Sequence, residues 1–175
     1  MALRSRLRDS EIMTEPKSGA HTADRWTRIM APTLGRPFSR RCVDIACRLA
    51  KSSGSNLYLV YVLEVPRVLG LDSAMPEEES LASEALEAAV KIATPFKLTP
   101  VARTHRVRNA KDGILAFINE QEIDLLVLGA RPDEAHGMPR ELTRELFMAS
   151  PCEVVVDYIA GEGQAPSEDD LSDED

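Results

Sequence analysis

Two loops of the sequence combine residue types that suit the binding of a phosphate or another small anion. They are residues 32–35 (PTLG) and residues 129–138 (GARPDEAHGM). Each loop follows an apolar segment and precedes a segment with helical spacing. A helix start offers free N–H groups and a partial positive charge, both of which favour anions. The two loops are therefore the candidate ligand-binding segments of the chain.

Other patterns of reactive residues are weak. His21, His105 and His136 each lack a second metal ligand at helical or strand spacing, and the group formed by Asp133, Glu134 and His136 is interpreted as a solvated polar loop. Neither a GxSxG nucleophile turn nor a GxGxxG dinucleotide fingerprint occurs. A phospho-receiver domain is excluded, because it needs paired acids after its first strand. The sequence predicts a protein that is not an enzyme, with a weak ATPase as the enzymatic alternative.

The two loops need a framework, and the hydrophobic periodicity predicts one of alternating strands and helices. Apolar residues run continuously or alternate in the five predicted strands, 26–31, 57–63, 98–107, 124–129 and 153–158. They recur at three- and four-residue spacing in the predicted helices, 38–53, 76–94, 111–121 and 139–149. We expect Pro32 to end the first strand, Gly54 to end the first helix, Pro76 to begin the second and Asn109 to cap the third.

This order of elements predicts a doubly wound α/β domain, with a five-stranded parallel sheet and helices on both faces. The runs LYLVYVL and DLLVLG have the apolar character of strands that are buried on both sides. The strand at 98–107 carries several bases, which predicts an edge position. Ligands of such sheets bind beyond the carboxyl ends of the strands, where neighbouring connections diverge. We expect the two loops to meet there.

Length and charge are those of one globular domain with polar ends. The chain has 175 residues, of which 43% are hydrophobic and 29% charged, and a formal net charge of −8. Residues 1–24 are predicted to be a disordered arm, 25–159 the domain, and 160–175 a disordered acidic tail. The alternative interpretation of the tail is a contact for a basic protein partner. The negative net charge argues against binding to nucleic acid or to an anionic membrane, because both need a basic surface. Met13 is an alternative start of the chain.

Cysteine content and hydropathy predict a cytoplasmic protein. Cys42, Cys47 and Cys152 contain no CxxC pair, and their odd number fits neither a disulfide framework nor a zinc site. We expect free thiols, buried or half-buried, in a reducing compartment. No stretch approaches the roughly 18–20 apolar residues that span a bilayer. The arginine-rich start also lacks the apolar core of a secretory signal.

Four segments together resemble the universal stress protein family over roughly residues 25–158: IMAPTLG, DIACRLAKSSGSNLYLVYVLE, EIDLLVLGARP and SPCEVVV. The resemblance implies a strand order of 3-2-1-4-5. It also implies that the last strand often pairs with its copy in a second subunit. Val154, Val155 and Val156 would form an open apolar edge, which invites such pairing. A homodimer through this strand is therefore expected.

The resemblance further implies that ATP-binding members carry G-x-x-G, nine residues and G-[ST] after strand four. Gly129 fits the first position, but Pro132 replaces the second glycine and has no N–H to offer a phosphate. The final G-[ST] pair of the pattern falls on Arg140 and Glu141. Glu141 lies near a predicted helix start, where its carboxylate could occupy the anion site and repel a triphosphate. After the first strand, Leu34 stands where nucleotide-binding members usually carry an aspartate.

We therefore expect a universal-stress-protein-like regulatory or interaction module that acts as a dimer in the stress response and binds no ATP or other cofactor. The alternative is a stress protein that binds ATP or AMP through a divergent phosphate loop, with nearby arginines offsetting the acid. Both hypotheses use one candidate pocket. Its predicted residues are Pro32, Thr33, Leu34, Gly35, Val62, Gly129, Ala130, Arg131, Gly137, Arg140 and Glu141.

Overall fold

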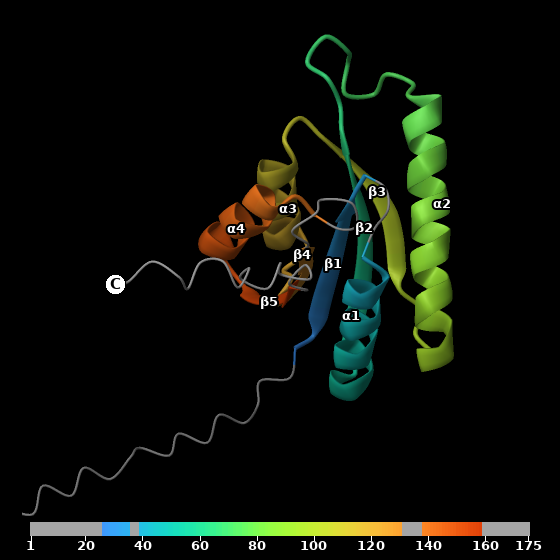
Figure 1. Ribbon diagram of the computed structural model, residues 1–175, viewed down its shortest axis with the longest axis vertical. Helices are drawn as coiled ribbons and strands as arrows, with labels where there is room; N and C mark the ends of the chain where they lie inside the picture. Colours follow the sequence, from blue (N-terminus) through green and yellow to red (C-terminus); the bar gives the residue numbers. More distant parts are fainter. Residues whose placement is uncertain (1–25, 36–38, 131–137, 159–175) are drawn as a thin grey trace, which may run out of the picture.

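The computed structural model describes residues 26–35, 39–130 and 138–158. Within them, five strands form an all-parallel sheet in the order β3-β2-β1-β4-β5 (Figure 1). The strands are β1 (Arg28–Leu34), β2 (Asn56–Glu64), β3 (Val101–Val107), β4 (Leu125–Ala130) and β5 (Glu153–Tyr158). The helices are α1 (Arg40–Ser53), α2 (Pro76–Ala93), the short η1 (Thr94–Phe96), α3 (Ala110–Glu120) and α4 (Arg140–Ala149). The predicted sheet and its strand order are confirmed.

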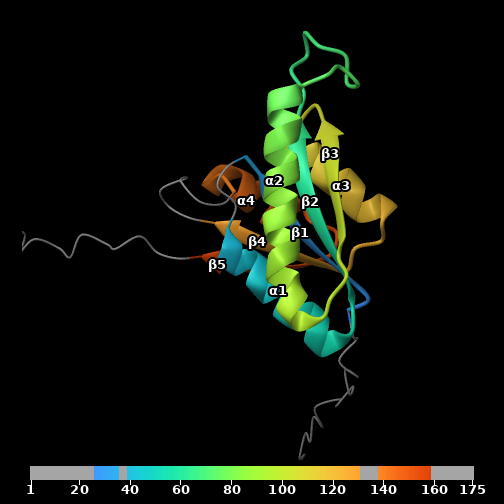
Figure 2. The same ribbon diagram turned by 90° about the vertical axis from the view of Figure 1, so that its right-hand side faces the viewer.

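Helices cover both faces of the sheet, as the sequence predicts. α1 and α2 pack on one face, and α3 and α4 on the other (Figures 1 and 2). Every residue of the inner strand β4 is buried. The continuous apolar runs follow from this position, because a parallel strand between two helical layers has no face toward water. Ile29 of β1 and Phe117 of α3 are fully buried, one on each side of the sheet.

Local sequence signals fix the ends of the helices. Gly54 ends α1 in the left-handed conformation, with a φ of 71°, which glycine adopts at little cost. Pro76 is the first residue of α2, where its missing N–H would have no helical partner. The Asn109 side chain caps α3 by accepting a hydrogen bond of 3.0 Å from a backbone N–H in the first turn. All three predicted helix signals are confirmed.

The first strand does not end at Pro32, and this expectation is wrong. β1 pairs with β2 as far as Leu34, whereas its pairing with β4 stops at Met30. When that second register is extended by one residue, the next donor to the Val127 carbonyl would be the N–H of Pro32, which proline lacks. The proline therefore separates β1 from β4 and leaves the pairing with β2 intact.

β3 is an edge strand, as its bases predict, but two of those bases cover the core. The Arg103 guanidinium lies 4.4 Å from the centroid of the Phe117 ring, and the His105 ring meets the same ring edge-on at 5.3 Å. An edge strand has no outer neighbour to cover the core beside it. The exposed Arg103 and the half-buried His105 supply that cover here, since both side chains combine a polar part with surface that packs on an apolar ring.

A carboxylate joins the amino ends of the strands, which we call the amino edge of the sheet. Asp124 accepts hydrogen bonds from the N–H of Thr27 at 2.8 Å, its hydroxyl at 2.7 Å, and the N–H of Arg28 at 3.1 Å. The Trp26 indole donates to the Glu153 carboxylate at 2.9 Å. The start of the domain is thus fixed at the amino edge, opposite the carboxyl edge where the candidate loops lie.

Candidate functional site

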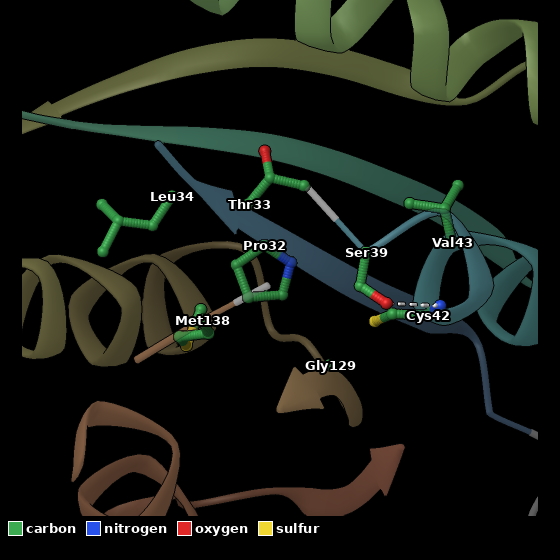
Figure 3. Close-up of a pocket in the computed structure, with 8 residues that line it drawn as sticks. All are labelled: Pro32, Thr33, Leu34, Ser39, Cys42, Val43, Gly129 and Met138. Atoms are coloured by element: carbon green, nitrogen blue, oxygen red, sulfur yellow. Dashed lines mark hydrogen bonds between the residues drawn. The ribbon is translucent and has the colours of Figure 1, made fainter. Parts of the chain in front are cut away.

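The carboxyl edge contains a small hollow between the ends of β1 and β4, beside the first turn of α1. Figure 3 shows the residues that line it, which are Pro32, Thr33, Leu34, Ser39, Cys42, Val43, Gly129 and Met138. The space inside is about 10 Å³, which is room for roughly one water molecule. The structure thus brings the two predicted loops together, but it leaves little space between them.

Gly129 allows α1 to approach the end of β4. A Cβ atom at this position would lie 2.7 Å from the Cβ of Ser39 and 2.8 Å from that of Cys42. Ser39 is buried, and its hydroxyl accepts a hydrogen bond of 3.2 Å from the N–H of Cys42, so it caps α1 against the strand. In this chain the first glycine of the phosphate loop is therefore required for the packing of a helix, whether or not a phosphate binds.

Met138 occupies the crevice in which this class of fold binds ligands. Its N–H donates to the Gly129 carbonyl at 2.9 Å, and the residue forms a parallel bridge to Ala130. Only 3% of it is exposed, and it belongs to the apolar cluster that contains Leu128 and Leu146. Backbone pairing thus directs a flexible thioether side chain, which adapts to irregular spaces, into the hollow.

Thr33 presents a buried hydroxyl at the same end of β1. The residue is 8% exposed, and its Oγ1 makes no hydrogen bond within the described part of the chain. The hydroxyl points away from Met138 (Figure 3). A buried polar group without a partner costs about 1–3 kcal/mol. A water molecule or a polar ligand group that reached Thr33 would remove that cost.

Cys42 supplies the hydrogen bond that Pro32 cannot make. Its Sγ lies 3.5 Å from the Val127 carbonyl oxygen. Burial, and to a lesser degree the charge of Asp157, raises the pKa of the Cys42 thiol to about 12. The thiol is therefore protonated at neutral pH and acts as a donor, not as a nucleophile. Asp157 is itself buried, and it pairs with the exposed Arg41 at 3.0 Å.

Other residues of the predicted pocket surround the hollow without lining it. Val62 and Ala130 are buried in their strands, and Gly35 is exposed in the turn after β1, with a φ of 65°. Three positions of the predicted phosphate loop fall outside the described residues: Arg131, Pro132 and Gly137. The predicted arm, the acidic tail and the polar group around His136 also fall outside them.

Arg140 and Glu141 begin α4, and both are exposed. Glu141 pairs with Arg144 at 3.1 Å, and the two side chains are 72% and 74% exposed. Arg140 forms no ion pair with another described residue. Glu141 thus contacts a base on its own helix and does not line the hollow, so its place in the anion site stays a prediction. Met138, and not Glu141, restricts the hollow.

The described residues offer no alternative centre for metal chemistry, since no three of their His, Cys, Asp and Glu side chains lie close enough to hold an ion. The three cysteines are free, with Cys42 and Cys47 buried and Cys152 half-buried, as predicted. Burial raises the pKa of the Cys47 thiol to about 11. Across the same part of the chain, no helix has the length and apolar character needed to cross a membrane.

The strand order and the position of the crevice define the class of this protein: a doubly wound α/β domain whose ligand edge lies where β1 and β4 separate. The model of the universal stress protein family matches residues 25–159. This chain belongs to the universal stress protein family. No curated protein matches it.

Solved structures of universal stress proteins share the fold. One from Archaeoglobus fulgidus has a TM-score of 0.61 at 19% identity, covering 75% of this chain and 93% of that chain. One from the same organism in complex with dAMP has a TM-score of 0.58 at 17% identity, with coverage of 75% and 96%. A family member from Arabidopsis thaliana with AMP bound has a TM-score of 0.52 at 14% identity, with coverage of 81% and 97%.

Proposed function

We propose that this universal stress protein acts in the stress response as a dimeric interaction module that does not use bound ATP. The observation that carries the proposal is the size of the hollow at the carboxyl edge. It measures about 10 Å³, whereas small-molecule pockets hold about 300–1,000 Å³. Met138 would have to leave its apolar cluster before an adenosine could enter.

Two of the side chains around the hollow, Leu34 and Met138, offer no group that would hold a nucleoside. Leu34 stands where the family resemblance implies an aspartate, and it packs on the same apolar cluster as Met138. A ribose placed against these two side chains would lose hydrogen bonds to water and gain none. Each unpaired hydroxyl would cost about 1–3 kcal/mol. Steric and polar effects therefore both oppose nucleotide binding in this state of the chain.

Thermal unfolding with and without nucleotide tests the proposal. A ligand that binds only the native state adds RT ln(1 + [L]/Kd) to the free energy of unfolding, which is about 2.7 kcal/mol at one hundred times Kd. We expect millimolar ATP, with and without magnesium, to leave the Tm unchanged. A rise in Tm that saturates with ATP, together with heat of binding in a calorimetric titration, would refute the proposal that the chain does not bind ATP.

A second candidate function is the binding of a nucleoside monophosphate. The unpaired Thr33 hydroxyl favours a polar ligand at this edge, and Arg140 is free of any described acid. Two structural neighbours are complexes with dAMP and AMP. A Tm rise with AMP that is lost in Thr33→Val and in Arg140→Ala would favour this function. The valine variant retains the shape of the threonine and removes only its hydroxyl.

The dimer is proposed at β5, the last strand of the sheet on that side. Within the described residues its outer edge has no partner strand. Val154, Val155 and Val156 are half-buried, and open apolar edge strands favour pairing with another strand. We expect light scattering to give the mass of a dimer for the native chain and of a monomer for Val155→Lys. A monomeric native chain would exclude this interface, and circular dichroism checks that the variant is folded.

A further inference from the structure

The connection between β2 and α2 carries three exposed apolar side chains, Val68, Leu69 and Leu71, which we call the tip. Their exposed fractions are 92%, 39% and 40%. The loop projects beyond the start of α2 at the carboxyl edge (Figures 1 and 2). Scattered apolar residues are common on protein surfaces, but a contiguous group is typical of an interaction site.

Two arginines hold the tip in one conformation. Arg106 donates to the carbonyls of Leu71, at 2.8 Å, and Ser73. Arg108 donates to two carbonyls that precede the tip, at 3.1 and 2.7 Å. The tip is thus exposed and also fixed by side chains from β3 and the loop after it. A loop that is ordered before binding loses less conformational entropy on association.

A groove of about 550 Å³ lies between α2 and the edge strand β3. These two elements stand side by side in Figure 2, below the loop that carries the tip. Its residues are Glu79, Ser83, Leu86, Glu87, Val90, Lys91, Ala102, Arg103 and Thr104. Leu86, Val90 and Ala102 are its apolar part, of which Leu86 and Val90 are half-buried and Ala102 is exposed. The volume is within the range of pockets that hold small molecules or several aliphatic side chains.

The charges beside the tip and the groove are complementary. Arg67 precedes the tip and Asp72 follows it, while Glu87 and Lys91 lie one helical turn apart along the groove. None of these four residues forms an ion pair with another described residue. An apolar tip flanked by a base and an acid thus matches an apolar groove flanked by an acid and a base.

We propose that the tip of one copy of this chain inserts into the α2–β3 groove of a second copy. Arg67 then meets Glu87, Asp72 meets Lys91, and the aliphatic side chains of the tip cover Leu86 and its neighbours. Two copies that insert both tips at once, related by a two-fold axis, would form a closed pair. This interface lies at the opposite edge of the sheet from β5, so it does not depend on the dimer proposed above.

Disulfide trapping in the full chain tests the proposal, in a Cys152→Ser background that removes the half-buried thiol. One sample carries Val68→Cys in the tip, and an affinity-tagged sample carries Ser83→Cys in the groove; both positions are exposed. We expect oxidation of the mixture to give a covalent pair of the two chains. The matched control replaces Ser83→Cys with Ser52→Cys, an exposed position on α1. Equal yields in the two mixtures would overturn the proposal.

Exchange of charges gives a second measurement, by sedimentation in the Val155→Lys background that removes pairing through β5. We expect the chain to associate there, and Arg67→Glu to weaken association about two- to fivefold in Kd, the range for an exposed ion pair. Addition of Glu87→Arg should restore it. A monomeric chain in the Val155→Lys background would overturn the proposed interface, and so would association that Val68→Asp does not weaken. Neither outcome would contradict the proposed dimer through β5 or the proposal that the chain does not bind ATP.

Discussion

Truncation of Met138 to alanine should reopen the hollow at the carboxyl edge. The residue is 3% exposed and packs with Leu128 and Leu146, so the change removes buried apolar atoms and leaves a cavity. Such truncations cost about 2–5 kcal/mol in protein cores. Because Met138 lies at the end of the sheet beside an existing hollow, its neighbours can relax, and we expect a loss of about 2–3 kcal/mol in the free energy of unfolding.

Urea unfolding measures this loss. With an m-value of about 1–3 kcal/mol/M, the midpoint should fall by roughly 0.7–3 M. Met148→Ala is the matched control, since it makes the same chemical change at a methionine that is 75% exposed on α4. The control should alter the free energy of unfolding by no more than about 0.5 kcal/mol.

The same variant distinguishes two explanations for the lack of nucleotide binding. Either Met138 blocks the crevice, or the crevice lacks the groups that would bind a nucleotide. If Met138 alone closes the crevice, AMP should raise the Tm of Met138→Ala more than that of the native chain. If Met138→Ala unfolds at the same urea concentration as the native chain, the side chain does not contribute the packing described here, and the explanation of the small hollow is wrong.

Three further changes address other parts of the structure. Gly129→Ala should lower the free energy of unfolding by about 1–3 kcal/mol, because its methyl group would lie 2.7 Å from the Cβ of Ser39; an unchanged urea midpoint would show that α1 can move away. Arg106→Ala should speed tryptic cleavage after Arg67 in limited proteolysis, and equal rates would exclude the clamp. Stability should fall as pH rises from about 9 to about 12, because the buried Cys42 thiol stays protonated there while the unfolded one ionises. Denaturant titrations at each pH should show a shallower fall for Cys42→Ala.

The fold could be predicted because its signals are redundant. The apolar runs of β2 and β4, the alternation of elements and the helix caps all indicate one parallel sheet between two helical layers. The error at Pro32 came from a local rule. Whether a proline ends a strand depends on which neighbour would have used its N–H, and that depends on pairing with β2 and β4, which are distant in sequence.

The site could be located from the sequence but not described in detail. The two loops were expected to meet because parallel strands end at one edge. Ser39 had a detectable signal, since serine before a helical segment is a common cap. Met138 had none, because its position depends on a backbone bridge to Ala130. Glu141 pairs with Arg144, three positions further along α4, and sequence spacing permits this pair without deciding between it and a contact at the helix start.

The hydrogen bonds around Asp124 have a practical consequence for how the protein is handled in experiments. They fix Thr27 and Arg28 at the amino edge of the sheet. Tyr158, by contrast, lies opposite Ala130, beside the hollow. A fluorophore or an immobilisation tag placed ahead of Trp26 would therefore leave the carboxyl edge and the tip accessible to partners, while one placed after Tyr158 would begin next to the hollow itself.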